Sequence, residues 1–151
     1  MTKKKLKQLQ VIHPNACGID VGATFHIVAI GMREEDVKKF GVYTKDHKEL
    51  IGYLKQEGVK DIAMESTGSY WQTIFSALQS SGFRVILVDG KQTKNLKAKT
   101  DVKDARAIYQ LHSYGLLSGC FLPDEATTQI RTLYRYRGHL INESARLVIF
   151  S

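Results

Sequence analysis

Near its amino terminus the chain reads Cys17-Gly18-Ile19-Asp20-Val21-Gly22, an apolar run that a single acid interrupts. Short apolar runs bounded by turn residues are typical of buried strands. A carboxylate buried in such a run lowers the stability of the fold unless a partner compensates for its charge. The stretch therefore predicts a core strand and marks Asp20 as a residue whose charge requires a partner.

Three further acids occupy comparable positions. Glu65 ends the run Asp61-Ile62-Ala63-Met64-Glu65, and Asp101 and Asp104 stand at the head of a helix predicted from Val102 to about Leu117. Residues three apart share a helix face, here the face predicted to meet the core. Magnesium and manganese ions bind several carboxylates at once and serve phosphodiester chemistry. We therefore expect a site for Mg²⁺ or Mn²⁺ formed by Asp20, Glu65, Asp101 and Asp104.

Each acid also has a structural interpretation. Glu65 could accept hydrogen bonds from the turn that follows it, and Asp101 and Asp104 could cap a helix or form ion pairs at its start. Asp20 would share a sheet edge with Glu65 only if their strands run parallel. The string Asp20-Val21-Gly22-Ala23-Thr24 also resembles the first phosphate motif of actin-like sugar kinases, although the second phosphate loop of those enzymes is missing here.

Hydrophobic periodicity predicts alternating elements around these acids. Further strands are expected over residues 24–31, 37–43, 62–64 and 83–88, and helices over 47–57 and 70–80. The resulting order β-β-β-α-β-α-β predicts an α/β fold, with a mixed sheet flanked by helices.

The composition suits one domain that is not inserted in a membrane. No apolar stretch approaches the roughly 20 residues that a membrane helix needs, and the basic start lacks the apolar segment of a signal peptide. Cys17 and Cys120 have no CxxC spacing. They predict reduced thiols in a cytoplasmic protein, with no zinc site.

The net charge of +7 is concentrated before residue 8 and after residue 90. A basic balance of this kind favours nucleic acid as a partner, although solubility alone would also account for it. Residues 90–99 are polar and predict an exposed loop or frayed helix along phosphates. The expected phosphate contacts are Lys91, Lys94, Lys97, Lys99, Lys103 and Arg106.

After Pro123 the apolar residues Ile130, Leu133, Leu140 and Leu147 recur at a spacing of three to four. This pattern predicts a helix seam for a partner helix, and hence homo-oligomers. The expected organisation is a basic tail (1–10), a metal-binding domain (11–122) and the start of a coiled-coil helix (123–151).

Three strings together resemble one family: Gly18-Ile19-Asp20-Val21-Gly22, Met64-Glu65-Ser66-Thr67-Gly68-Ser69-Tyr70 and Lys99-Thr100-Asp101-Val102-Lys103-Asp104-Ala105-Arg106. The family is the DEDD insertion-sequence transposases, which include the Piv DNA invertase and the bridge-RNA-guided recombinases. The resemblance implies a RuvC-like domain of the ribonuclease H superfamily, with a central five-stranded sheet. It also implies that the four acids are a tetrad that binds divalent metal.

Full-length members of that family continue through a coiled coil into a second domain with a catalytic serine, so this sequence resembles their amino-terminal domain. The implied function is a catalytic domain that acts on phosphodiester bonds of DNA, with a guide RNA in the full-length protein. A stand-alone Holliday-junction resolvase or nuclease of the same fold, and a non-catalytic nucleic-acid-binding module, are the alternatives.

Overall fold

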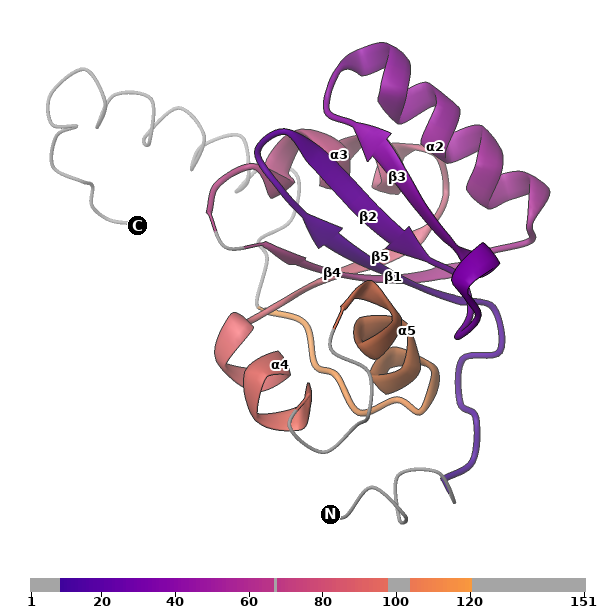
Figure 1. Ribbon diagram of the computed structural model, residues 1–151, viewed down its shortest axis with the longest axis vertical. Coiled ribbons are helices and arrows are strands. Elements are labelled where there is room, and N and C mark those ends of the chain that lie inside the picture. The colour runs from indigo at the N-terminus through magenta and orange to yellow at the C-terminus, as the bar shows by residue number, and fades with distance from the viewer. Residues whose placement is uncertain (1–8, 67, 98–103, 121–151) are drawn as a thin grey trace, which may run out of the picture. The chain divides into compact units, whose positions relative to one another are not determined.

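The computed structural model describes residues 9–66, 68–97 and 104–120 (Figure 1). The amino-terminal half of this part builds a meander followed by a helix and a strand: β1 (Ala16–Val21), β2 (Phe25–Ala29), the 3-10 helix η1 (Glu34–Asp36), β3 (Val37–Gly41), α2 (Thr44–Gln56) and β4 (Asp61–Ser66). The rest alternates helix and strand and ends in two helices: α3 (Trp71–Ser80), β5 (Arg84–Val88), α4 (Gly90–Lys97) and α5 (Ala105–Ser113).

The five strands form one mixed sheet in the order β3-β2-β1-β4-β5. Antiparallel pairing joins β1 to β2 and β2 to β3, whereas β4 runs parallel to both β1 and β5. This arrangement confirms the α/β class, the mixed five-stranded sheet and the predicted element order. Among the described residues no helix has the length and apolarity needed to cross a bilayer.

Helices cover both faces of the sheet, with α2 and α3 on one side and α4 and α5 on the other (Figure 1). Fully buried residues fill the first layer, among them Ile19, Leu50, Leu54, Ile74 and Leu78. A second buried cluster lies on the α5 side and consists of Ala63, Val88, Ile108, Leu111 and Leu117. Burial of each of the larger side chains stabilises the fold by about 1.5–3 kcal/mol, and this burial holds the helices on the sheet.

Helix α5 lies directly on β1 because Gly18 has no side chain. A Cβ atom at that position would overlap the backbone nitrogen of Tyr109 and would stand 2.7 Å from the carbonyl oxygen of Ala105. At the other end of the helix, the Ser113 carbonyl accepts hydrogen bonds from the backbone of Ile12 and His13, just before β1. The helix therefore runs antiparallel to β1, and its first residue lies toward the carboxyl edge of the sheet.

One sequence prediction on this side of the sheet was wrong in detail. The helix predicted from Val102 to about Leu117 begins at Ala105 and ends at Ser113. The polar segment, for which a loop and a frayed helix were both open, forms helix α4, with Thr93 fully buried. The Thr93 hydroxyl donates to the Gly90 carbonyl at 3.1 Å, so this polar side chain keeps a hydrogen-bond partner although it is buried.

Candidate functional site at the carboxyl edge of the sheet

Asp20 and Glu65 lie side by side on neighbouring parallel strands. They are register partners between β1 and β4, whose backbones run about 4.8 Å apart in such a ladder. Register partners present their side chains on the same face of the sheet, and alternation along β1 makes it the face on which Gly18 meets α5. Both acids are half-buried. The parallel pairing that the sequence left open therefore holds, and it brings two of the four predicted acids together.

The start of α4 lies against the second of these acids. A Cβ atom on Gly90, the first residue of the helix, would stand 3.6 Å from Oε2 of Glu65. The amino terminus of a helix carries partial positive charge, which attracts a nearby carboxylate. That distance is an ordinary van der Waals contact, so the first residue of the helix lies beside the Glu65 carboxylate.

Asp104 is the residue that caps α5. Its carboxylate accepts a hydrogen bond from the Arg106 backbone at 2.9 Å and forms an ion pair with the Arg106 guanidinium at 3.2 Å. Partial burial raises the pKa of Asp104, but the hydrogen bonds from Arg106 outweigh it and hold that pKa below its usual value. With its side chain 49% exposed, Asp104 does not face the core as the longer helix predicted. It serves the capping role that was its structural alternative.

A complete metal centre is not formed by the described residues. None of their His, Cys, Asp or Glu side chains gather in groups of three or more that could hold an ion. Asp101 lies outside the described residues. Magnesium commonly uses one or two protein carboxylates and fills its remaining positions with water and substrate phosphate, so the pair of Asp20 and Glu65 is a suitable donor set.

The predicted phosphate contacts have different surroundings. Lys91 and Lys94 are exposed on α4, and Lys97 ends that helix. Lys99 and Lys103 lie outside the described residues. Arg106 is held by Asp104 and also donates to the Met32 carbonyl at 3.3 Å, which ties α5 to the loop after β2. Its guanidinium is therefore occupied within the fold.

Sequence reasoning passed over Asp89, which directly follows β5. The last residue of that strand, Val88, is the register partner of Glu65, so Asp89 lies at the same edge of the sheet. Its carboxylate is exposed and accepts a hydrogen bond from the Lys91 backbone at 2.9 Å. An acid directly after an apolar strand is the signal that singled out Glu65, and it could have found Asp89 as well.

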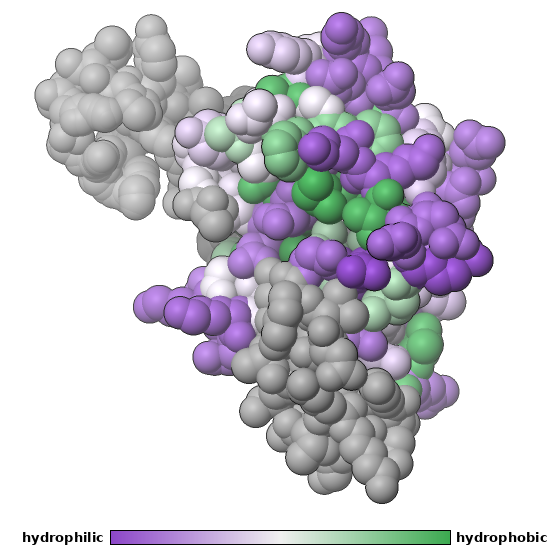
Figure 2. Space-filling model, in the orientation of Figure 1, coloured by the Kyte–Doolittle hydropathy of each residue, from purple (hydrophilic) through white to green (hydrophobic). Residues whose placement is uncertain are grey.

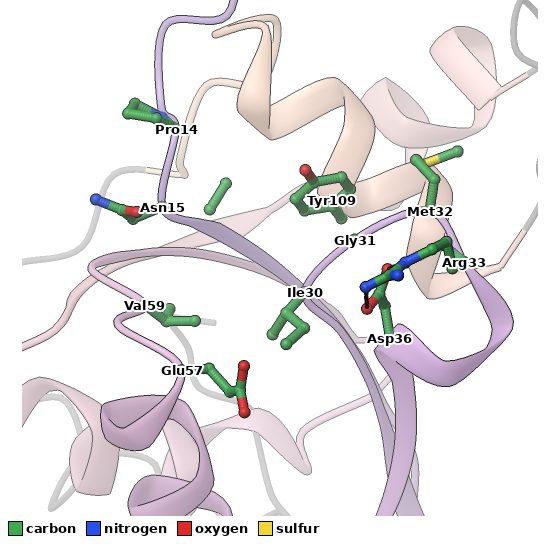
Figure 3. A pocket seen from close by; sticks show the side chains of 11 residues that line it. Pro14, Asn15, Ile30, Gly31, Met32, Arg33, Asp36, Glu57, Val59 and Tyr109 are labelled. Atoms are coloured by element: carbon green, nitrogen blue, oxygen red, sulfur yellow. Dashed lines mark hydrogen bonds and ion pairs between the residues drawn. The ribbon is translucent and has the colours of Figure 1, made fainter.

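A pocket of about 430 Å³ opens elsewhere, at the opposite end of β1 (Figure 3). Asn15, Glu57 and Tyr109 line it, together with the ion pair between Arg33 and Asp36, whose atoms are 3.1 Å apart. Asn15 precedes β1, whereas Asp20 stands near the end of that strand. The pocket is therefore separate from the acidic pair.

His26 is one of the buried histidines that belong to the core. Its Nδ1 accepts a hydrogen bond from the Gly22 backbone at 3.3 Å, and its ring stacks on His47 with centroids 5.5 Å apart. Burial, together with the neighbouring His47, lowers the pKa of His26 to about 4. The ring is thus neutral near pH 7 and helps to fix the turn that follows Asp20.

Comparison with solved structures defines the class of fold. A structure of RuvC from Thermus thermophilus in complex with a Holliday junction substrate matches with a TM-score of 0.50 and 13% identity, covering 70% of this chain and 98% of that one. A second Thermus thermophilus RuvC structure matches with a TM-score of 0.39 and 14% identity, covering 82% of this chain and 96% of the other. The fold is therefore RuvC-like, as the resemblance implied.

Sequence comparison then gives the family. A family model described as transposase, that of the DEDD transposases of the IS110 type, matches residues 17–149. The chain belongs to this transposase family. No curated protein gave a significant match. Family and fold together make the chain a catalytic domain of the transposase or nuclease kind, a class of enzyme that acts on DNA.

Proposed function

We propose that this chain is the metal-dependent catalytic domain of a DNA transposase and that Asp20 and Glu65 hold its divalent cation. The observation that supports this proposal is the placement of the two acids as register partners on parallel strands. Two carboxylates so close repel each other, and a cation between them relieves that repulsion. Asp104, which caps α5, and Asp101, which lies outside the described residues, would complete the proposed tetrad.

The acids and the lysines at this edge of the sheet would have different roles. Asp20 and Glu65 would orient the cation, and the partial positive charge at the start of α4 lies beside the Glu65 carboxylate. Mg²⁺ or Mn²⁺, when bound, polarises the phosphate and makes a bound oxygen nucleophile more acidic. Lys91 and Lys94, exposed on α4, neutralise neighbouring phosphates and set the position of the DNA without reading its sequence.

The partners we propose are DNA and, in the full-length protein, a guide RNA. Membership of the transposase family and the basic character of the chain support DNA. The guide RNA and the second domain with its serine nucleophile are proposed from the family resemblance. Association through residues 123–151 is proposed from the apolar pattern of that segment. A stand-alone junction resolvase is the second candidate, favoured by the RuvC neighbour that was solved with a Holliday junction.

Cleavage of end-labelled DNA tests the catalytic part of the proposal. The purified chain should nick linear or four-way DNA slowly with Mg²⁺ or Mn²⁺ and not in EDTA. Asp20→Asn and Glu65→Gln should each lower the rate by more than about 100-fold, because even residues that only support a metal ligand can cost that much. Glu57→Gln, at the far pocket, is the matched control and should cut like the wild type.

The choice of substrate separates the two candidates. Strong preference for a four-way junction, with paired symmetrical cuts, would favour a resolvase. Nicking without such preference is expected of a transposase domain. Cleavage that persists unchanged in EDTA, or in both acidic variants, would contradict the proposed role of the carboxylates.

A further inference from the structure

Next to the acidic pair, part of the sheet face carries an exposed aromatic ring. Phe25 begins β2 and is 41% exposed, although phenylalanine in a sheet is usually buried. Its register partner on the edge strand β3 is Gly41, which has no side chain of its own, and the Asp46 carboxylate fills the place where a Cβ would stand. Figure 2 shows apolar side chains at the surface of the strand region in this view, with hydrophilic side chains around them.

The ring shares its face of the sheet with Asp20. Ile27 pairs with Asp20 on one side and with Lys39 on the other, and directly opposed residues of antiparallel strands lie on the same face. Phe25 is two residues from Ile27 and so lies on that face as well. Helix α5 covers the other end of this face, where Gly18 pairs with the fully buried Ala29.

A lysine accompanies the ring. The ammonium nitrogen of Lys39 lies 4.3 Å from the centroid of Phe25, and Lys39 is exposed. This cation–π contact fixes a positive charge at the ring without burying it. Ring and ammonium together offer what a nucleotide needs, an apolar face for its base and a cation for its phosphate.

We propose that Phe25 and Lys39 bind an unpaired strand of DNA and lead it to the acidic pair. A base stacks on Phe25, and the adjacent phosphate pairs with Lys39. Lys39 is two strand spacings from Asp20, about 10 Å between backbones, a distance that a short run of nucleotides spans. This inference rests on the proposed function of Asp20 and Glu65, because the strand would continue into their site.

The charges of the surface argue for this occupant over a protein partner. An apolar protein segment docked on Phe25 would have to desolvate the ammonium of Lys39 and approach the carboxylate of Asp20. A nucleic acid strand instead pairs a phosphate with the Lys39 ammonium, and a metal ion lies between the strand and the Asp20 carboxylate. Stacking also requires a base that is not paired within a duplex, which selects a single strand.

Fluorescence titration of a single-stranded oligothymidylate that contains one 2-aminopurine tests the proposal in EDTA, where no cleavage occurs. The wild type should bind the oligonucleotide and change the 2-aminopurine signal by stacking. Phe25→Leu keeps an apolar side chain but no ring, and should weaken binding roughly 5- to 150-fold, the range measured for loss of one stacked base. Phe25→Trp should restore both affinity and signal. Melting temperatures verify that each variant is folded.

Lysine variants test the phosphate contact. Lys39→Gln should flatten the dependence of log affinity on log salt by about 0.7, the value for one phosphate of a single strand. Lys55→Gln, on α2, is the matched control and should leave the slope unchanged. A duplex of the same sequence should bind with no dependence on the ring at position 25.

Failure of this inference is distinguishable from failure of the proposed function. Manganese binding, measured in parallel, should be lost in Asp20→Asn and retained in Phe25→Leu, whereas strand binding in EDTA should show the reverse. Wild-type affinity and 2-aminopurine signal in Phe25→Leu would overturn the strand site and leave the metal site standing. Equal losses for duplex and single strand would also overturn it.

Discussion

Asp20 on β1 and Glu65 on β4 are paired in register across two parallel strands. The pairing extends from Ala16 with Asp61 to Val21 with Ser66, so the whole ladder fixes their relative position. A shift by one residue would move one acid to the opposite face, against the buried side chains of α2 and α3. The hydrophobic pattern of both strands therefore also positions the acidic pair.

Helix α5 and the acidic pair are linked through Gly18, which yields a stability prediction. Gly18→Ala should push α5 away from β1 and lower the free energy of unfolding by about 1–3 kcal/mol, the usual cost of overpacking. Gly52→Ala is the control, because a Cβ there would meet nothing within 4 Å. Gly52 lies inside α2, so that change should raise stability by about 0.5–1 kcal/mol. Urea denaturation measures both, and equal stability of the two variants would refute this account of Gly18.

Acid should destabilise the domain through two buried histidines. Burial is the main cause that lowers the pKa of His26 and of His112 from the ordinary 6.5 to about 4. Between those pH values the unfolded chain binds more protons, so stability is full above pH 6.5 and falls as the pH drops toward 4. Each histidine can contribute up to about 3 kcal/mol to that loss.

Substitution identifies the residue responsible. His112→Asn should flatten the fall in melting temperature between pH 6.5 and 4, because it removes one group that must be protonated on unfolding. His13→Asn is the comparison, because the His13 ring stacks on His112 and is the more exposed of the two. A pH profile that is unchanged by His112→Asn would show that this histidine is not the source.

The salt dependence of duplex binding should depend on the basic face of α4. Lys91→Gln and Lys94→Gln together should flatten the slope of log affinity against log salt by up to about 0.9 for each true phosphate contact. Lys55→Gln with Lys60→Gln removes the same charge elsewhere and should lower affinity less. Identical slopes for the two double variants would exclude α4 from the interface.

Much of this fold could be predicted from local patterns. Apolar runs gave the strands, and helical spacing gave α2 and α3, whose ends are marked by Gly58 and Gly82 with φ of 75° and 97°. Local signals left loop and helix both open for α4, since a polar sequence does not show that Thr93 will be buried. They also misjudged Asp104, whose hydrogen bonds with Arg106 set the start of α5 at Ala105.

The site was only partly accessible to sequence reasoning. Asp20 and Glu65 could be singled out because each interrupts or ends an apolar run, and Asp101 and Asp104 because they stand at the head of a predicted helix. Their adjacency depends on parallel pairing between strands that are far apart in the chain, which no local pattern specifies. The exposure of Phe25 likewise follows from its pairing with Gly41 across the hairpin and from where α5 ends its cover of the sheet.

Titration of Mn²⁺ into the purified chain, followed by isothermal calorimetry and by electron paramagnetic resonance of free Mn²⁺, tests the central claim most directly. The account predicts saturable binding by the wild type, at least tenfold weaker binding in Asp20→Asn and in Glu65→Gln, and wild-type binding in Glu57→Gln. Bound metal should also raise the melting temperature of the wild type by mass action. Wild-type affinity in both acidic variants, or no binding by the folded wild type, would contradict the claim that these two carboxylates hold the cation.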